Sequence, residues 1–275
     1  MEQDREAAGR AIVLTSPAGG RAEVMAHGAH VVRWTDPASG EVLYLSPRSR
    51  FGPGASIRGG IPVIFPQFAD QGPLPKHGFA RTAEWEVAER GSRYAVLRLA
   101  DSAETRAVWD HAFECRLRVE LGDALAVTLA VRNMGEAAFD FTCALHTYLR
   151  VGDIRSVWID GLKGIRYRDK VAGGEHVQRD ARLRFAGETD RVYLDAPDEL
   201  RLVDGGAWDS VLLRKHGFDD TVVWNPWAEK ARGMDDLGED QFPRFVCVEA
   251  ACAGRPVRLE PGGRWKGSQE ITAER

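Results

Sequence analysis

Hydrophobic and polar residues alternate most regularly between residues 113 and 131. Odd positions from Phe113 to Leu121 are apolar, and the even positions between them are charged. A period of two indicates a strand with one buried face and one solvated face. A Gly-Asp pair at residues 122–123 interrupts the pattern, which resumes from Leu125 to Val131. The stretch therefore predicts an antiparallel hairpin whose outer face meets water.

The segment from Ala138 to Leu149 shows a second alternating pattern of a different kind. One face carries Phe139, Phe141, Cys143 and Leu145, whereas the other carries Asp140, Thr142, Ala144 and His146. Small residues beside a histidine leave space above the sheet. This strand is therefore predicted to place His146 next to a ligand-sized opening.

Short strand-like segments separated by turn residues fill most of the remaining chain. The only helical pattern lies between Ala228 and Met234. Many short strands with regular turn signals are typical of a large all-β antiparallel sandwich. No linker or repeat divides the sequence, so we expect one domain over residues 1–275, with residues 1–10 as a flexible extension. The other expected strands are Ala22–Met25, Val31–Trp34, Glu41–Leu45, Ala83–Ala88, Tyr94–Ala100, Val157–Asp160, Arg182–Phe185, Arg191–Leu194, Glu199–Val203, Val211–Lys215, Thr221–Trp224, Arg244–Ala250 and Val257–Leu259.

The stretch from Arg58 to Arg81 is rich in proline and glycine, which break regular ladders and permit unusual backbone shapes. It predicts a shaped loop around one short strand, Val63–Phe65. Its polar side chains are mostly cationic or neutral, with one acid among them. A rigid loop with clustered cations favours a pre-formed pocket for a small anion, although a connecting loop with solvated arginines has the same composition. The polar residues include Arg58, Gln67, Asp70, Lys76, His77 and Arg81.

Composition narrows the class of protein. With 275 residues the chain can bury a large core without disulfides, and its formal charge of −4 argues against a nucleic-acid partner. The four cysteines lack C-x-x-C spacing and lie in apolar segments, so buried free thiols in a reducing compartment are expected. The first residues lack a signal-peptide pattern, and no apolar run is long enough to span a membrane. We expect a cytoplasmic protein, and nothing in the sequence requires more than a monomer.

Glu249 and His146 are the candidates for acid–base chemistry. Glu249 lies within the apolar segment FVCVEAAC, where burial of a carboxylate raises its pKa toward the range of a general base. A structural ion pair with an arginine would give the same local sequence. His146 could serve as the complementary acid, or equally as a hydrogen-bonded core histidine.

Other catalytic signatures are missing from the sequence. The histidines show no metal-ligand spacing, and there is no phosphate loop, dinucleotide motif or G-x-S-x-G elbow. We therefore expect no metal and no cofactor. Trp224 and Asn225 offer an aromatic face and an amide for a sugar, and Asp190 offers a carboxylate for a hydroxyl, although each fits a structural role as well.

Several segments together resemble one family. RGGIPVIFPQF, HGFAR, ALHTYLRVGDI, DGLKG, YRDK, ETDRVYLD, VVWNPW and FVCVEAA occur in the order found in the glucose-6-phosphate 1-epimerases of the aldose 1-epimerase superfamily. The resemblance spans about residues 22–271. One departure is Trp109-Asp110-His111, where relatives often have Trp-Pro-His.

The resemblance implies a β-supersandwich fold and the interconversion of sugar anomers without a cofactor. It assigns acid–base roles to His146 and Glu249. It places Arg58 and Arg81 at a phosphate group, His77 and Gln67 along the pocket, and Asp190 at a sugar hydroxyl.

Two other functions are compatible with the sequence. An aldose 1-epimerase for free sugars would keep Glu249 and His146 and leave the arginines to the scaffold. A non-catalytic sugar-phosphate-binding protein would need neither group. The presence of both groups, together with Arg58 and Arg81, favours an enzyme that acts on a phosphorylated hexose.

Overall fold

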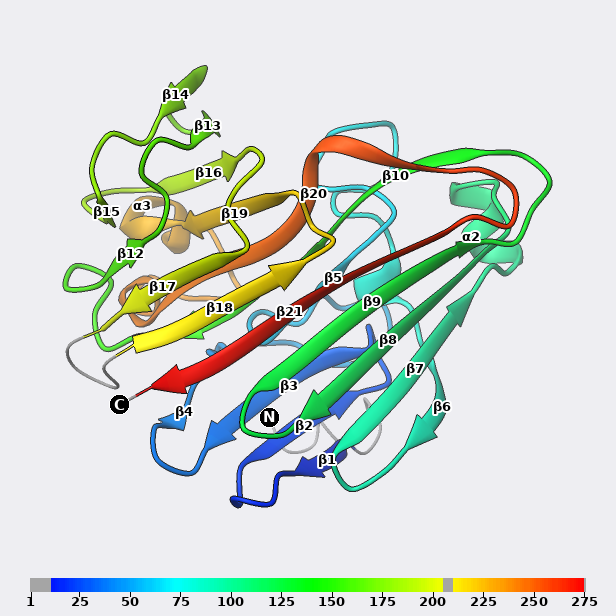
Figure 1. Ribbon diagram of the computed structural model, residues 1–275, viewed down its shortest axis with the longest axis horizontal. Helices are drawn as coiled ribbons and strands as arrows, with labels where there is room; N and C mark the ends of the chain where they lie inside the picture. The colour runs from blue at the N-terminus through cyan, green and yellow to red at the C-terminus, as the bar shows by residue number, and fades with distance from the viewer. Residues whose placement is uncertain (1–10, 205–209, 275) are drawn as a thin grey trace.

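The computed structural model describes residues 11–204 and 210–274, so the proposed extension at residues 1–10 lies outside the described part. These residues form two large antiparallel sheets and one small sheet around a common apolar core (Figure 1). This arrangement confirms the predicted all-β sandwich. None of the helices in the described part is long and apolar enough to cross a membrane.

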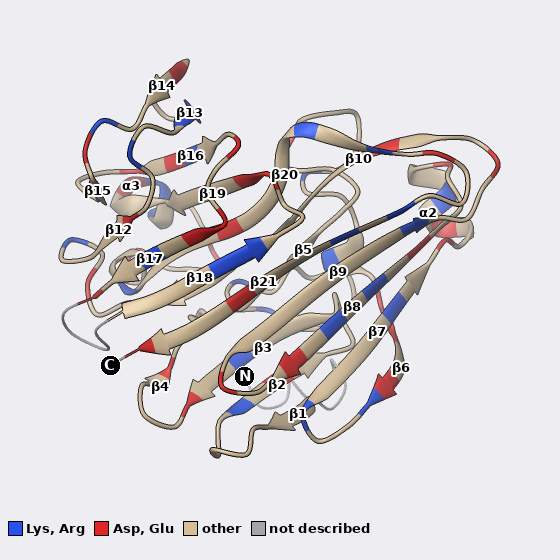
Figure 2. Ribbon diagram, in the orientation of Figure 1, with Lys and Arg blue, Asp and Glu red and all other residues tan. Residues whose placement is uncertain are grey.

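The larger sheet contains the hairpin that the alternating pattern predicted. β8 and β9 pair from Phe113 and Asn133 to Leu121 and Leu125 without a register shift. The apolar positions of β8 are buried, whereas its charged positions form part of an outer face that carries both signs of charge (Figure 2). The sheet comprises β6 (Glu86–Arg90), β7 (Tyr94–Ala100), β8 (Phe113–Leu121), β9 (Leu125–Asn133), β12 (Trp158–Asp160), β15 (Arg182–Arg184), β17 (Glu199–Val203), β18 (Ser210–His216) and β21 (Arg264–Glu274).

The second large sheet is covered by protein on both faces around its centre. β10 is exposed at Asp140 but buried at every position from Phe141 to Leu145. Its register with β20 shifts between Phe141 and Cys143. The sheet comprises β5 (Val63–Ile64), β10 (Phe139–Leu145), β11 (Tyr148–Arg150), β13 (Arg166–Asp169), β14 (Glu175–Val177), β16 (Thr189–Tyr193), β19 (Asp220–Asn225) and β20 (Phe245–Leu259).

The small sheet and the short helices complete the fold. The strands of the small sheet contribute Leu14, Val24 and Val31 to the same apolar core as the two large sheets. The small sheet comprises β1 (Ile12–Thr15), β2 (Arg21–Met25), β3 (His30–Asp36) and β4 (Gly40–Glu41). The helices are α2 (Ala103–Val108) and α3 (Trp227–Arg232), with 3₁₀ turns at Ala80–Thr82 and Phe242–Arg244.

Several boundaries differ from the sequence-based expectation. The segments expected as two strands at 244–250 and 257–259 form the single strand β20. The long strand β21 and the helix α2 were not predicted. α2 begins at a reciprocal cap, in which Ser102 and Thr105 each accept a backbone N–H from the other. This device uses threonine where the usual motif has an acid or amide.

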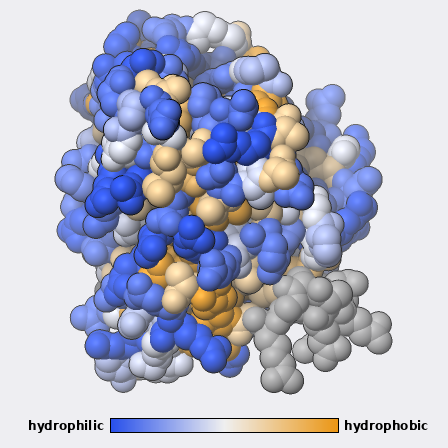
Figure 3. Space-filling view, turned by 90° about the vertical axis from the view of Figure 1, so that its right-hand side faces the viewer, coloured by the Kyte–Doolittle hydropathy of each residue, from blue (hydrophilic) through white to orange (hydrophobic). Residues whose placement is uncertain are grey.

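The prediction of buried free thiols is confirmed. All four cysteines are buried and free, as expected for structural thiols. The face seen in Figure 3 is mostly hydrophilic, with apolar residues in narrow strips between polar ones.

Candidate active site

The candidate site is a row of side chains across the second large sheet, on the face opposite the common core. Cross-strand pairing sets Asp190 of β16 against Trp224 of β19, and Val222 of β19 against Glu249 of β20. His146 follows β10 and stands next to Glu249. These side chains line a cavity of about 310 Å³. Antiparallel neighbours share a face, so pairing alone brings together residues that lie far apart in the chain.

His146 and Glu249 are the closest pair of titratable groups in the row. The His146 Nε2 atom lies 3.3 Å from Glu249 Oε1. The pair is almost removed from water, with Glu249 2 % and His146 8 % exposed. The other polar atoms of the pair, His146 Nδ1 and Glu249 Oε2, are buried without a hydrogen-bond partner in the described part of the chain. Buried polar atoms without hydrogen bonds destabilise a protein. Because these two atoms border a cavity, we expect a ligand there to form the missing hydrogen bonds.

Burial shifts both pKa values toward the neutral forms. It raises the pKa of the Glu249 carboxyl well above its usual value, with a further increase from Asp190 that Lys170 opposes. It lowers the pKa of His146 well below the usual value, and the charges of His77, Arg58 and Arg81 add to this. A neutral carboxyl and a neutral imidazole together carry one proton more than the fully deprotonated pair, a carboxylate beside a neutral imidazole. That is the same number as a carboxylate beside an imidazolium, so the contact between them can interconvert the two forms.

The stretch 58–81 covers one side of the cavity. Phe68 and Ala69 pack with Ile64 against small residues of the sheet, Ala144 and Ala251, in a second apolar cluster. Small side chains at these positions let the loop approach the sheet closely. The loop thereby holds Arg58, Lys76, His77 and Arg81 over the row of sheet residues.

Arg58 is held in place by two partners. Its Nε and Nη2 donate to Asp236 Oδ2 at 3.2 and 3.0 Å, and Nη1 donates to the Tyr148 hydroxyl at 3.0 Å. The Tyr148 ring in turn stacks on His146, with centroids 4.8 Å apart. Neither Tyr148 nor Asp236 was singled out from the sequence. A tyrosine in an apolar strand and an aspartate in a polar loop carry no signal of their own.

Two other cations at the cavity, Arg81 and Lys170, make no ion pair with a carboxylate in the described residues. Arg81 donates from Nη2 to the Lys76 carbonyl at 3.1 Å, and its buried Nε has no partner. Lys170 lies over the Phe68 ring at 5.0 Å. Lys170 and Lys230 were not predicted, although Lys170 stands in the segment YRDK that carries the family resemblance. Their combined charge makes the cavity suited to an anion.

His77 is fixed as a hydrogen-bond donor toward the cavity. Its backbone adopts a φ of 68°, and Nδ1 accepts the Ala69 N–H at 3.2 Å. Burial, with Arg81 and Lys76, lowers the pKa of His77 to about 3. A neutral imidazole that accepts at Nδ1 must carry its proton on Nε2. Its ring lies 5.9 Å from that of His146.

Asp190 and Lys230 form the opposite side of the cavity. Burial raises the pKa of Asp190, while Lys170 and Lys230 oppose that shift. The Asp190 carbonyl accepts the Lys170 N–H at 2.8 Å, which ties the two residues together. Lys230 on α3 pairs with Glu188 at 2.6 Å. The predicted residues Arg58, His77, Arg81, His146, Asp190 and Glu249 are thus gathered around one cavity.

Gln67 and Asn225 are exceptions to the expectation. The Gln67 amide donates to the carbonyls of Ala69 and Leu74 and accepts the Leu74 N–H, so it closes its own loop and lines a different cavity. Asn225 is fully buried and donates to the carbonyls of Phe242 and Phe245. Both amides form hydrogen bonds with backbone groups and are therefore not available to a ligand. Trp224 does line the cavity, as an aromatic wall.

Comparison with known proteins gives one consistent result. The family described as Aldose 1-epimerase matches residues 10–272. Proteins named "Putative glucose-6-phosphate 1-epimerase" from Cenchrus ciliaris and Escherichia coli are 36% and 37% identical, over 95% and 87% of this chain and 84% and 82% of their own. A solved structure described as a putative mutarotase from Salmonella typhimurium superposes with a TM-score of 0.87 at 33% identity, covering 96% of this chain and 90% of that one.

Proposed function

Since the chain belongs to the aldose 1-epimerase family, we propose that it interconverts the α and β anomers of a hexose 6-phosphate, with glucose 6-phosphate as the first candidate. The observation that carries this proposal is the combination in one cavity of an acid–base pair and cations without carboxylate partners. The pair accounts for ring opening, and the cations account for an anionic substrate.

The reaction requires two coupled proton transfers. The Glu249 carboxylate accepts the proton of the anomeric hydroxyl, and the His146 imidazolium donates a proton to the ring oxygen. The electrons of the O–H bond form the C1 carbonyl as the bond between C1 and the ring oxygen breaks. Rotation about C1–C2 and reversal of both transfers close the ring on the other face. Each group is typically worth about a hundred- to ten-thousand-fold in rate.

This mechanism needs the shared proton on His146, whereas burial favours it on Glu249. A phosphate bound at Arg58 and Arg81 would offset the positive charge that helps to keep His146 neutral. Binding would therefore raise the pKa of His146 and favour the reactive arrangement of the pair. In this way the phosphate group contributes to catalysis as well as to binding.

The remaining groups fit recognition of the sugar. His77 presents an N–H donor, Asp190 a carboxylate for a hydroxyl, and Trp224 an aromatic face for the C–H groups of the ring. Arg81 offers an unpaired Nε to the phosphate. Arg58, held by Asp236 and Tyr148, keeps a fixed orientation without reorganising on binding.

The test is anomer exchange at equilibrium, measured by NMR magnetisation transfer with glucose 6-phosphate, glucose and galactose. We expect faster exchange for the phosphate. Replacing Arg81 by Ala should raise KM for glucose 6-phosphate about 10- to 100-fold, since a charge-assisted hydrogen bond is worth about 1.5–3 kcal/mol. Arg58→Ala should act in the same direction.

The matched control is Arg118→Ala, which removes a partly exposed arginine of the hairpin paired with Glu120. It should leave exchange unchanged. Equal acceleration of free sugars, with equal losses in the arginine variants, would identify a general aldose 1-epimerase. Binding without acceleration of any sugar would identify a sugar-phosphate-binding protein and refute the catalytic proposal.

A further inference from the structure

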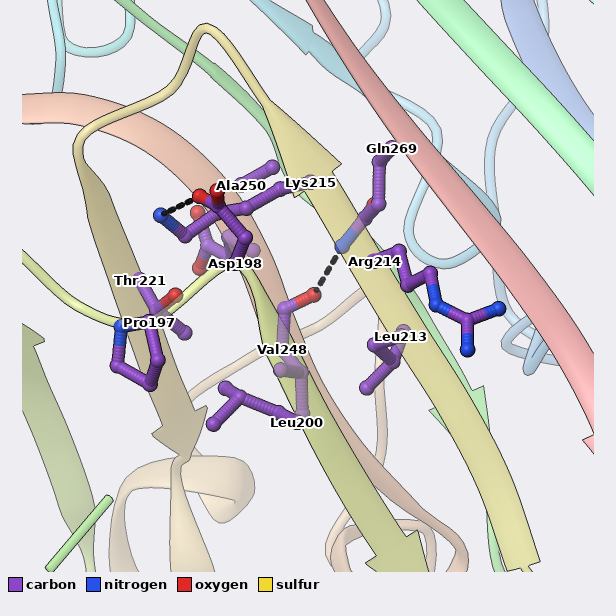
Figure 4. Close-up of a pocket in the computed structure, with 11 residues that line it drawn as sticks. Pro197, Asp198, Leu200, Leu213, Arg214, Lys215, Thr221, Val248, Ala250 and Gln269 are labelled. Atoms are coloured by element: carbon purple, nitrogen blue, oxygen red, sulfur yellow. Dashed lines mark hydrogen bonds and ion pairs between the residues drawn. The ribbon is translucent and has the colours of Figure 1, made fainter. Parts of the chain in front are cut away.

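A buried glutamine from the opposite sheet reaches the backbone beside the acid–base pair. Gln269 lies on β21, where it pairs with Lys215 of β18 and Val127 of β9. It is only 3 % exposed, and its amide crosses the apolar core toward β20 (Figure 4). A polar group in such a place is stabilising only when its hydrogen bonds are satisfied.

The Gln269 amide bridges two residues that adjoin the catalytic pair in sequence. Its Nε2 donates to the Val248 carbonyl at 3.1 Å, and its Oε1 accepts the Thr147 hydroxyl at 2.5 Å. Thr147 follows His146, and Val248 precedes Glu249. The donors and acceptors fix the orientation of the amide, because the reverse orientation would set its oxygen against a carbonyl oxygen.

The bridge stands where the β-ladder is broken. Leu145 pairs with Ala250, and Tyr148 pairs with Cys247, but the residues between them are irregular. The Val248 N–H still donates to the Thr147 carbonyl at 3.1 Å. The Thr147 N–H instead turns back to the Leu145 carbonyl at 3.0 Å. The Val248 carbonyl therefore loses its usual ladder donor, and the Gln269 amide takes that place.

From this geometry we propose that Gln269 is a positioning residue for the acid–base pair, acting through Thr147 and Val248. The inference rests on the proposed function. The register is the same on both sides of the break, so His146 stands opposite Glu249. The bridge restores the lost hydrogen bond from the far sheet and holds the two backbones at a fixed separation. Side chains on the opposite face then keep the 3.3 Å contact.

The experiment compares near-isosteric variants by the same NMR exchange assay. Gln269→Met and Thr147→Val each remove the bridge, and we expect each to lower kcat about 10- to 100-fold, because small misplacements of reacting groups are costly. KM should stay unchanged, since the phosphate and hydroxyl contacts come from other elements. Thr147→Ser retains the hydroxyl and should restore most of kcat. The double variant should have about the same kcat as the less active of the two single variants, because both changes break the same bridge.

The control is Asn133→Leu, which removes another buried amide that bridges backbone carbonyls, those of Ala137 and Leu259. It should lower the melting temperature without changing kcat. The pH profile of kcat should shift in Gln269→Met and remain unchanged in Asn133→Leu. If Gln269→Met does not fold, the contrast between Thr147→Val and Thr147→Ser decides the matter.

The inference is overturned by a Gln269→Met or Thr147→Val enzyme with the wild-type kcat and pH profile. It is also overturned if Asn133→Leu lowers kcat to the same extent, since general loosening would then explain the loss. Failure of the proposed function has a different signature. In that case the wild-type protein itself does not accelerate exchange, and this inference fails with it.

Discussion

The β8–β9 hairpin and the β10–β20 pair are both antiparallel strand pairs, but their surroundings are very different. The hairpin is paired residue by residue, and its outer face carries charges in contact with water. The β10–β20 pair has a register shift and a broken ladder, and its outer face is covered by the loop from Arg58 to Arg81. Charges on the hairpin are solvated, whereas the Glu249 carboxyl in the covered part of β20 is buried. The regularly paired hairpin therefore belongs to the scaffold, whereas the candidate site lies where the interrupted ladder is covered by the loop.

The difference also appears in the acids of the two pairs. Glu120 on β8 is exposed and pairs with Arg118 at 3.0 Å. Glu249 on β20 is buried without an arginine partner among the described residues and has a strongly raised pKa. The ion pair with arginine that was the alternative for Glu249 is thus not what the structure shows. A carboxyl that is buried from water and forms no ion pair with arginine is suited to proton transfer.

The largest expected effect comes from exchanging these acids for amides. Glu249→Gln should lower the rate of anomer exchange about a hundred- to ten-thousand-fold, because it removes one of the two proton-transfer groups. His146→Asn should act similarly. Glu120→Gln, the matched change on the hairpin, should leave the rate unchanged. The measurement is exchange of glucose 6-phosphate by NMR, and near wild-type rates in both site variants would show that the pair is not catalytic.

The next prediction concerns stability. Here a change in the hairpin should have a larger effect than a change in the acid–base pair. Leu129 is fully buried on β9 in the common core. Leu129→Ala should lower the free energy of unfolding by about 2–5 kcal/mol through lost burial and a cavity. Glu249→Gln should change stability little, because burial already favours the uncharged carboxyl. Urea unfolding followed by fluorescence measures both. A large loss in Glu249→Gln would show that the carboxylate is structural.

The same contrast explains what could be predicted from the sequence. Alternation revealed the hairpin because its inner positions are uniformly apolar. It missed β21, whose buried positions include Gly267 and Gln269, neither of which is apolar. The end of β20 was recognised only as a separate strand. Its exposed residues around Arg255 and Pro256 conceal the continuity of the strand, which pairing with β10 maintains.

Site prediction had a similar limit. His146 and Glu249 stood out because each is a titratable group in an apolar strand, but only the pairing of β10 and β11 with β20 brings them together. Lys170 lies in a turn and Lys230 in a short helix. In such segments the sequence shows no regular alternation from which the direction of a side chain could be predicted. The prediction that Gln67 lines the pocket was wrong for the same reason. Its loop turns the amide toward its own backbone, although its neighbours face the cavity.

The smallest expected effect is a shift in titration within the site. Arg58 and Arg81 contribute to the lowered pKa of His146. An anion bound to them offsets positive charge and so favours the imidazolium, which means that the pKa of His146 rises toward its usual value. At a fixed mildly acidic pH, inorganic phosphate should therefore increase the protonated fraction of His146. The measurement is an NMR titration of the labelled imidazole with and without phosphate.

Arg81→Ala separates this electrostatic coupling from a general effect of salt. Removing the cation should itself raise the pKa of His146, because one of the charges that disfavour the imidazolium is gone. It should also reduce the further response to phosphate, which then has one cation fewer to bind and offset. Chloride at equal ionic strength should have much less effect, since guanidinium groups bind phosphate through paired hydrogen bonds. An equal response to chloride, or an undiminished response in Arg81→Ala, would show that the phosphate does not act through the arginines. The charged side chains on the outer face of the hairpin are in contact with water, which weakens their effect on one another.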